Sequence, residues 1–551
     1  MAASLLMLAG AGATVYFPYA TKIALDRYLL RKEAAGLARF VCRTGVVMLL
    51  AAGATALRLR LMAYVGQDTV RRIRLDLFTH LQRLPVAYFD KMPVGKLVTR
   101  LTGDVDALAE LFGGAIVQIF GDILMLFGFL VVMFLVDWRL ALVTTLLLGP
   151  LVFVFTFLEH RIRLAEDRVR EEAAGVNAVL QENVAGIRVI QAFWAQEWFQ
   201  QRFEAANGRL LAAGLQAVKV FGFFWPVVDF TWVAGTGLLF FAGGKWVLGG
   251  TLTVGTLVAF FGYANQFFGP MHSLSQATRV IQRALAGAVR IREVMDIPPE
   301  TSSSLPPMPA IQGRVEVKDL VFAYEDRPVL AGINLQVEPG EVVALVGRSG
   351  AGKTSLANLL YRFYAPRSGQ ILVDGRDIAL YEVESYRRQL ALVLQEPFLF
   401  SGTVRDNLRY GRPEATEEEM AAALAAVGLA EGGITLDTVL QERGASLSFG
   451  QRQLLALARA LLASPRIIIL DEATAYVDAL TEQKLQAAVA RVLAGRTAFV
   501  IAHRLATIRE ADRILVIEDG RIVEAGRHEE LLAARGRYWE LCRRQGLVSI
   551  E

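Results

Sequence analysis

Eight residues in the C-terminal half of the chain have the types and the spacing needed to hold a chain of phosphates: Gly347-Arg348-Ser349-Gly350-Ala351-Gly352-Lys353-Thr354. Glycines allow successive backbone N–H groups to curl around phosphate oxygens, the Lys353 ammonium group neutralises their charge, and the Thr354 hydroxyl group can bind Mg²⁺. A helix that follows would add its positive N-terminal end. The alternative, a glycine-rich turn without a ligand, is disfavoured because the pattern is complete and follows the apolar segment Val342–Val346.

A pair of carboxylates, Asp471 and Glu472, ends a second apolar segment at 467–470. Asp471 could hold Mg²⁺, directly or through water, and Glu472 could polarise an attacking water as a general base. Such pairs also end strands without any function, so the pair alone leaves both interpretations open. Gln395 could bind the metal or position water, and His503 could contact the γ-phosphate. By themselves these two residues are more typical of ordinary polar loops.

The composition indicates a membrane protein with more than one domain. The chain has 551 residues, of which 54% are hydrophobic, and this is too long for one domain and too apolar for an ordinary soluble protein. Its net charge of +4 is too small to favour nucleic acid as the main partner. With only Cys42 and Cys542 present, a disulfide framework or a cysteine-based metal site is not expected.

Apolar segments are concentrated before residue 280, and they predict six membrane-spanning helices. Residues 140–158 and 251–271 carry no charge, and residues 1–20 are also uncharged. A spanning helix needs about 20 such residues. The first segment lacks a basic region in front of it, which favours a transmembrane helix over a cleaved signal peptide. Charges interrupt the other three segments, at about 40–64, 110–136 and 215–244.

The connections between these segments are unequal in length. Those at 65–109 and 159–214 are long, charged and helical in pattern, and both are rich in arginine. The positive-inside tendency places both in the cytoplasm, although Arg27, Arg31, Lys32 and Arg39 on the opposite side weaken this assignment. A Pro- and Ser-rich linker follows at 297–312. Beyond it, short β-branched segments alternate with helical ones, which predicts a mainly parallel sheet covered by helices. The expected strands are 314–317, 342–346, 371–373, 467–470, 498–501 and 513–517.

The order of the motifs resembles that of the ATP-binding-cassette (ABC) family. Leu447-Ser448-Phe449-Gly450-Gln451 is similar to its signature motif, usually written LSGGQ. In the family's order, an aromatic A-loop residue would be Tyr324, and the phosphate loop, Gln395, the signature, Asp471-Glu472, the D-loop residue Asp478 and the switch residue His503 follow. In the membrane half, residues 93–105 and 182–193 resemble the two intracellular loops of the exporter type.

The resemblance implies a half-transporter in the membrane. Its fold is a six-helix, all-α transmembrane domain (1–296), a linker (297–312) and an α/β ABC nucleotide-binding domain (313–551) with a P-loop. It implies integral localisation, in a bacterial inner membrane with the ATPase domain in the cytoplasm. The partners implied are the lipid bilayer, a hydrophobic or amphipathic substrate and a second half-transporter, and none is a nucleic acid.

The resemblance also assigns roles in binding ATP and Mg²⁺. Two ATPase domains would close head to tail on two ATP molecules, and the long loops would carry coupling helices onto them. Glu472, His503 and Gln395 would act in catalysis, and Thr354, Gln395 and Asp471 would serve Mg²⁺. The signature would reach the partner's nucleotide. The implied nucleotide contacts are Tyr324, Gly347, Arg348, Ser349, Gly350, Ala351, Gly352, Lys353, Thr354, Ser355, Ser448, Gly450 and Gln451.

Several positions depart from the family pattern. Phe449 replaces the first glycine of the signature pair, Ala475 stands where serine is common, and Gln441 stands where glycine is usual. An intact phosphate loop beside an altered signature favours one subunit of a heterodimer over a homodimer. The chain also starts inside an apolar stretch without the usual cytoplasmic segment, so either the sequence is truncated or its start is unusual.

The substrate is not specified by the sequence. Asp122 and Asp229 lie within expected spans, where ionisable groups usually face a cavity or a partner, and an interhelical ion pair or a boundary position is the alternative. A drug, a lipid or a peptide is compatible with ATP-driven export by alternating access. The alternatives are a channel or regulatory subunit gated by ATP, and an importer built on the exporter fold.

Overall fold

The computed structural model describes residues 2–300, 305–471, 479–501 and 508–544. Two compact units divide the chain. Unit 1 comprises Met1–Leu77 and Val98–Glu293, and unit 2 comprises Phe78–Leu97 and Val294–Glu551. The short segment Phe78–Leu97, which lies in the first long loop, therefore belongs with the nucleotide-binding half.

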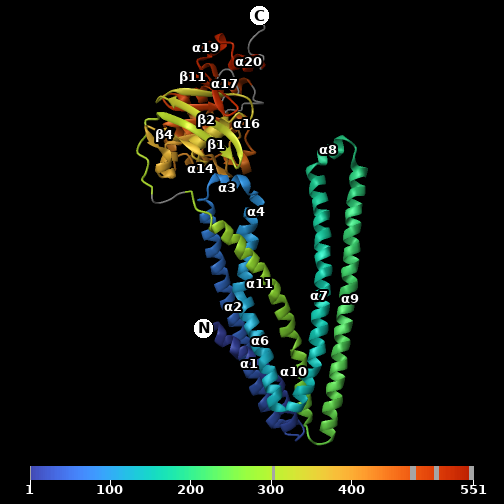
Figure 1. The fold of residues 1–551 in the computed structure, drawn as a ribbon. Coiled ribbons are helices and arrows are strands. Elements are labelled where there is room, and N and C mark those ends of the chain that lie inside the picture. Colours follow the sequence, from blue (N-terminus) through green and yellow to red (C-terminus); the bar gives the residue numbers. More distant parts are fainter. Residues whose placement is uncertain (1, 301–304, 472–478, 502–507, 545–551) are drawn as a thin grey trace. The chain divides into compact units, whose positions relative to one another are not determined.

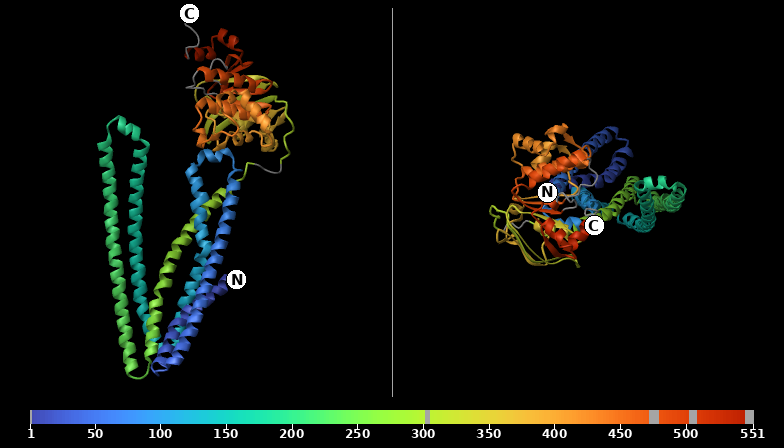
Figure 2. Two further views of the ribbon diagram at one scale, coloured as in Figure 1. Left: turned by 180° about the vertical axis from the view of Figure 1, so that it is seen from behind. Right: turned by 90° about the horizontal axis from the view of Figure 1, so that it is seen from above.

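Unit 1 is built of long helices (Figure 1). The second predicted segment, 40–64, lies in α2, which continues without a break into the first long loop. The third, 110–136, ends a helical stretch, Val94–Val136, that begins within the same loop. In the same way, α7 runs into the second long loop and α9 runs out of it. The pair α7 and α9 lie side by side in both views of Figure 2 and are joined by the short α8. The helical elements are α1 (Ala2–Ile23), η1 (Ala24–Leu29), α2 (Ala34–Leu81), α4 (Val94–Thr99), η2 (Arg100–Asp104), α5 (Val105–Glu110), η3 (Leu111–Ala115), α6 (Ile116–Val136), α7 (Trp138–Ala185), α8 (Ile187–Ala192), α9 (Gln196–Leu248), α10 (Val254–Gln266) and α11 (Phe268–Met295).

Five helices in the described part of the chain are long and apolar enough to cross a membrane: Ala3–Leu29, Ala34–Leu81, Val94–Val136, Trp138–Ala185 and Gln196–Leu248. They contain five of the six apolar segments expected from the sequence. The sixth, 251–271, is divided between α10 and α11 at Phe267. Since α10 has 13 residues and about 20 are needed to cross the bilayer, neither α10 nor the more polar α11 meets the criterion alone.

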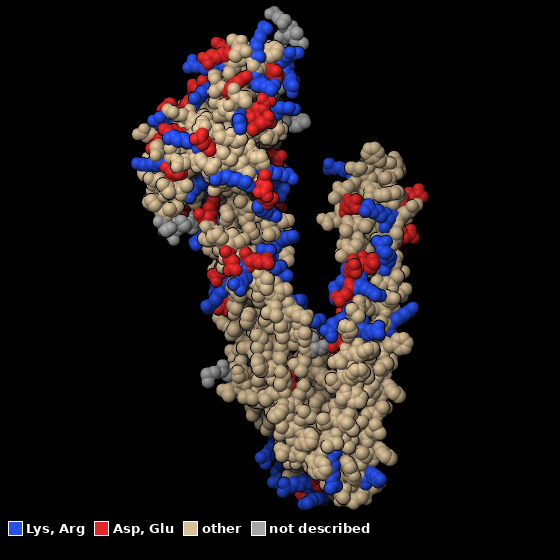
Figure 3. Space-filling view, viewed as in Figure 1, with Lys and Arg blue, Asp and Glu red and all other residues tan. Residues whose placement is uncertain are grey.

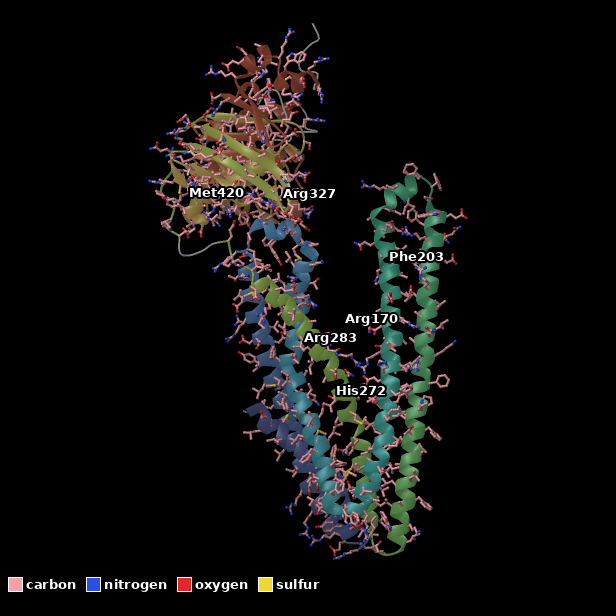
Figure 4. All side chains as sticks on the ribbon, in the orientation of Figure 1. Arg170, Phe203, His272, Arg283, Arg327 and Met420 are labelled. Carbon is pink, nitrogen blue, oxygen red and sulfur yellow. The ribbon has the colours of Figure 1, made fainter. Side chains whose placement is uncertain are left out.

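A tan band with very few charged residues crosses unit 1 in the space-filling view (Figure 3), as expected for helices in lipid. Its interior is closely packed around Phe129, Phe260 and Tyr263, which are fully buried. Ion pairs join α11, whose residues His272 and Arg283 are labelled in Figure 4, to charged residues of other helical elements. The pairs are Arg279–Glu159, Arg283–Glu110, Arg290–Asp104 and Glu293–Arg100.

Unit 2 contains two main sheets, and this corrects the expectation of a single, mainly parallel one. The six-stranded sheet has the order β12-β11-β3-β10-β9-β6, in which all pairs but β11–β12 are parallel. The expected strands at 314–317 and 371–373 lie instead in an antiparallel sheet of order β2-β1-β4-β5. The strands are β1 (Val315–Tyr324), β2 (Arg327–Val337), β3 (Val342–Val346), β4 (Ser368–Val373), β5 (Arg376–Asp377), β6 (Leu390–Val393), β7 (Gly402–Thr403), β8 (Val439–Leu440), β9 (Ile467–Asp471), β10 (Thr497–Ile501), β11 (Arg513–Glu518) and β12 (Arg521–Gly526).

Helices cover the sheets of unit 2, and two buried clusters fill the space between the layers. Strands β3, β9 and β10 are almost wholly buried, which explains why they are near-continuous apolar runs without alternation. The helices of this unit are α3 (Val86–Lys91), α12 (Lys353–Leu360), η4 (Ile378–Leu380), α13 (Val383–Arg387), α14 (Val404–Arg409), α15 (Glu417–Ala426), η5 (Ala430–Gly432), η6 (Glu442–Gly444), α16 (Phe449–Leu462), α17 (Ala479–Leu493), α19 (His528–Ala533) and α20 (Arg537–Arg544).

Candidate functional site

The phosphate loop lies between β3 and α12, at the carboxyl end of a central parallel strand. Two glycines are required by geometry. A Cβ atom at Gly352 (φ 106°) would lie 2.6 Å from the Leu330 side chain, and one at Gly347 would lie 2.2 Å from the Ile517 carbonyl oxygen. Arg348, Ser349, Gly350 and Thr354 are exposed, whereas Ala351 and Ser355 are buried. The exposed members therefore present their backbone and hydroxyl groups to solvent, as a ligand site requires.

The side chain of Lys353 contacts the backbone of the phosphate loop. Its side chain is 6% exposed, and its Nζ atom donates hydrogen bonds to the carbonyl oxygens of Gly347 at 2.8 Å and Arg348 at 2.9 Å. Burial lowers the pKa of Lys353, and the negative charge of Asp471 opposes that shift. The Lys353 ammonium group is thus held beside the phosphate loop and the N-terminus of α12 by two carbonyl oxygens, which carry no full negative charge to neutralise it.

The parallel sheet brings Asp471 and Gln395 to the same edge as the loop. Ile501 at the end of β10 pairs with both Asp471 on β9 and Leu345 on β3. Gln395 follows β6, the strand on the other side of β9, and its side chain is exposed. Because the carboxyl ends of parallel strands meet at one edge, three motifs far apart in the sequence converge there.

The oxygen donors at this edge fit Mg²⁺. Thr354 offers a hydroxyl group, Gln395 an amide oxygen and Asp471 a carboxylate, and hard oxygen ligands few in number are what Mg²⁺ prefers beside phosphates. Among the described residues, His, Cys, Asp and Glu do not form groups of three that could hold a metal ion.

Tyr324, at the end of β1, belongs to a cluster of three rings. Its ring centroid is 4.7 Å from that of Phe322 and 5.1 Å from that of Tyr364, and both contacts are edge to face. Tyr324 itself is half-buried, so part of its ring remains accessible to a ligand. The structure thus provides an oriented aromatic ring where the sequence predicts stacking with adenine.

The signature residues lie at the beginning of α16, on a different element from the phosphate loop. Ser448 caps the helix: its Oγ atom accepts from the Gln451 N–H group at 3.3 Å, and the Gln451 side chain accepts from the Ser448 N–H group at 2.9 Å. The side chain of Gln451 is therefore engaged in the cap. Phe449 is half-buried, with the Arg452 guanidinium group 5.8 Å from its ring. The helix N-terminus remains a site suited to an anion.

Three predicted catalytic or loop residues, Glu472, Asp478 and His503, lie outside the described residues, as does Ala475. Within the membrane-spanning region, Asp122 is buried on α6 and accepts from the Gln118 side chain at 2.9 Å. Asp229 is exposed on α9. The first of these two candidates is thus packed against its own unit, whereas the second is free to face lipid, a substrate or another subunit.

Sequence reasoning missed the residues of unit 2 that connect α3 to the nucleotide-binding sheets. The Tyr364 hydroxyl group donates to the Asp90 carboxylate, and Lys91 forms an ion pair with Glu325 at 2.9 Å. Glu300, in the predicted linker, pairs with Arg387 on α13. The sequence offers one signal for these contacts, the position of Glu325 directly after Tyr324. The two residues of each pair are too far apart in the sequence for a local pattern to reveal them.

Comparisons with known proteins agree with this geometry. A family described as "ABC transporter transmembrane region" matches residues 1–271, and one described as "ABC transporter" matches residues 330–475. An ATP-dependent lipid A-core flippase of Syntrophus aciditrophicus is 36% identical over 97% of this chain and 90% of its own. A fatty acid ABC transporter ATP-binding/permease protein of Mycobacterium bovis is 39% identical over 88% of this chain and 78% of its own. A solved structure, a bacterial Atm1-family ABC exporter with ATP bound, has a TM-score of 0.78 and 29% identity, and the match covers 100% of this chain and 98% of the other.

Proposed function

Since this chain belongs to the ABC transporter family, as a half-transporter of the exporter type, we propose that its substrate is an apolar or amphipathic molecule such as a drug, a lipid or a peptide. ATP hydrolysis in the nucleotide-binding domain drives the transport. The observation that carries the ATP-driven part of the proposal is the convergence of the phosphate loop, Asp471 and Gln395 at one edge of the parallel sheet. The relatives named for lipid A-core and fatty acids support a substrate with a long apolar part.

The residues at the edge of the parallel sheet, and Tyr324 at the end of β1 in the antiparallel sheet, each have a role in this proposal. Tyr324 stacks on the adenine base, and Lys353 with the loop N–H groups holds the phosphates. Thr354, Gln395 and Asp471 would hold Mg²⁺, which would supply positive charge beside the phosphates. Glu472 polarises the attacking water and His503 contacts the γ-phosphate. In this way the chain positions the phosphates and the water before the bond breaks.

Each ATP molecule is shared between two chains in this proposal. The N-terminus of α16, capped by Ser448 and followed by Gly450, approaches the γ-phosphate bound by the partner subunit. We favour a heterodimer, because this chain combines a complete phosphate loop with Phe449 in the signature and Ala475 in the D-loop. The two shared sites would then differ in rate. A homodimer with two equal sites is the alternative.

The coupling of hydrolysis to the membrane helices is proposed to use α8. The loop around it carries unusually exposed apolar residues, among them Phe193 at 79% and Trp194 at 86%. Unit 2 offers a groove of about 1110 Å³, lined by aromatic and basic residues that include Tyr361, Phe398 and Tyr410. An apolar loop and an aromatic groove of this kind complement each other, and we propose that α8 of one subunit docks on the ATPase domain of its partner.

Two other functions explain fewer of the observations. A channel or regulatory subunit gated by ATP has no need of a complete hydrolytic set, whereas this sequence contains Glu472 and His503. An importer on the same fold is disfavoured by the match to an exporter over the whole chain. We place the protein in a bacterial inner membrane with its ATPase domain in the cytoplasm, and the bacterial relatives support this location.

Transport in vesicles tests the proposal. The chain, alone and together with a candidate second half-transporter, would be reconstituted so that the ATPase domain faces outward, and fluorescent phospholipid and fatty acid would be offered with ATP. Accumulation or flipping that depends on ATP and on Lys353 is the expected result. Continuous hydrolysis of ATP without movement of any lipid, drug or peptide probe would contradict export, and movement in the opposite direction would identify an importer.

A further inference from the structure

In the aromatic cluster around Tyr324, the rings of Phe322, Tyr324 and Tyr364 each contact the other two. The ring centroids of Phe322 and Tyr364 are 5.6 Å apart, and each of these rings also meets Tyr324 edge to face. Such T-shaped contacts are favoured by the charge distribution of aromatic rings, and they fix the tilt of one ring relative to another. The orientation of Tyr324 therefore depends on the orientation of Tyr364.

Tyr364 is in turn held by α3, the short helix of the first long loop. Its hydroxyl group donates a hydrogen bond to Oδ2 of Asp90. Burial and the neighbouring carboxylate of Asp90 raise the pKa of Tyr364, so the hydroxyl group remains a donor at physiological pH. A hydrogen bond from a neutral donor to a carboxylate is about twice as strong as one between neutral groups. The Asp90–Tyr364 bond is therefore well suited to set the position of the ring.

A second contact joins α3 to the turn that follows β1, and it involves no aromatic ring. Lys91 and Glu325, the residue after Tyr324, form an ion pair at 2.9 Å with side chains 64% and 71% exposed. Exposed pairs of this kind contribute little because water screens them. Asp90 is also exposed, but its hydrogen bond is made by the hydroxyl group of a ring in the cluster, and of the two contacts it is therefore the one able to influence the cluster.

We propose that Asp90 is a positioning residue for the adenine base of ATP, and that it acts through Tyr364 on Tyr324. The inference rests on the proposed stacking of Tyr324 on adenine and goes beyond it, because it assigns the base-recognition step to a residue of the membrane-connected loop. α3 follows α2 in the chain and belongs to the same unit as the nucleotide-binding sheets. By thermodynamic reciprocity, a base that favours the docked ring also favours the Asp90 contact, so this loop responds to the base separately from the phosphates.

The test compares ATP with ribose 5-triphosphate, which has the same phosphates and sugar but lacks the base. The full chain, with its partner subunit if one is required, would be placed in lipid nanodiscs with EDTA to prevent hydrolysis. The dissociation constant of ribose 5-triphosphate divided by that of ATP measures the contribution of the base. Asp90→Ala and Tyr364→Phe are each expected to reduce this ratio by about twofold to fivefold, the size expected for partial loss of a stacking contact. Asp90→Asn, which keeps an acceptor, is expected to retain most of it, and Lys91→Ala is the matched control with an unchanged ratio.

Tyr324→Ala separates failure of this inference from failure of the proposed base site. If Tyr324→Ala reduces the ratio and Asp90→Ala adds nothing in the double variant, the two residues act on one step, as proposed. An unchanged ratio in Asp90→Ala beside a reduced one in Tyr324→Ala would overturn the role of Asp90 alone. An unchanged ratio in Tyr324→Ala would overturn base stacking and the inference with it. Equal weakening of both ligands by Asp90→Ala would mean a general structural effect and would also overturn the inference.

Discussion

Glu300 and Arg387 form a two-pronged ion pair, with N–O distances of 2.8 Å and 2.6 Å and side chains only 19% and 20% exposed. The same glutamate donates its N–H group to the Arg83 carbonyl oxygen at 2.7 Å, just beyond the end of α2. Arg387 also donates to the carbonyl oxygens of Tyr361 and Arg362. One residue of the linker therefore fastens the end of a long helix to α13, which precedes β6 and Gln395.

Glu300→Gln should lower the thermal stability of the nucleotide-binding unit. The substitution leaves a half-buried guanidinium group without its carboxylate, a change that costs about 1–3 kcal/mol when a charged hydrogen bond is lost. Thermal unfolding of the full chain in detergent, followed by intrinsic fluorescence, measures it. The control is Glu384→Gln, which breaks the exposed pair of Arg388 and Glu384 and should change stability little. Equal stability of the two variants would refute a fastening role.

The sequence predicts the ATPase core well because its motifs are local. The phosphate loop and the strand before Asp471 are each recognisable within a dozen residues, and parallel pairing then brings them together. Strand β6, which precedes Gln395, is not among the expected strands. The expectation that 314–317 and 371–373 belong to the mainly parallel sheet is wrong, because they pair with each other in the antiparallel sheet. Strand length and β-branching indicate a strand, but they do not indicate which neighbour it pairs with.

The contacts of α3 could not be predicted from the sequence for a different reason. Asp90 and Tyr364 are 274 residues apart, and nothing in the local pattern of either residue marks its partner. The division of the segment 251–271 at Phe267 is similar, because an uninterrupted apolar run predicts a continuous helix. Hydropathy reports the preference for lipid, and packing against other helices decides where a helix ends.

Lys353→Ala should reduce ATP hydrolysis by more than a hundredfold. The side chain supplies the positive charge at the mouth of the loop, and loss of a preorganised charge near reacting phosphates costs about 3 kcal/mol or more. Steady-state phosphate release from the reconstituted transporter measures the effect. Because the alanine variant leaves the carbonyl oxygens of Gly347 and Arg348 without their donor, Lys353→Arg is the companion that keeps a cation. Wild-type turnover in the alanine variant would exclude the proposed role.

Glu472→Gln should nearly abolish hydrolysis while ATP binding is retained. The amide cannot act as a general base, whereas Lys353 and the loop N–H groups still hold the phosphates. Single-turnover hydrolysis and equilibrium binding of ATP, measured on the same preparation, distinguish the two steps. If a partner subunit supplies a second active site, that site must be silenced by the equivalent change. Turnover close to wild type after both changes would remove Glu472 from the mechanism.

The chain purified alone should hydrolyse ATP slowly if it is one subunit of an obligate heterodimer. Phe449 lies at the first position of α16, where the partner's nucleotide would bind, and Phe449→Gly restores the common signature. In a homodimer made of this chain alone, that variant should increase turnover severalfold, because it improves both shared sites. Vigorous hydrolysis by the unaltered isolated chain, insensitive to Phe449→Gly, would contradict the heterodimer.

Trp194→Ser should uncouple hydrolysis from transport. The side chain is 86% exposed beside α8, and a large aromatic residue buried at an interface contributes about 2 kcal/mol or more to docking. Loss of this contact with the groove of the partner's ATPase domain should leave ATP binding intact and remove the stimulation of hydrolysis by substrate. Trp138→Ser, at another strongly exposed tryptophan (61%), is the control, because the link after α6 lies at the opposite end of α7. The measurement is the number of substrate molecules transported per ATP hydrolysed. Equal ratios in the two variants would contradict a role of the residues around α8 in coupling hydrolysis to transport.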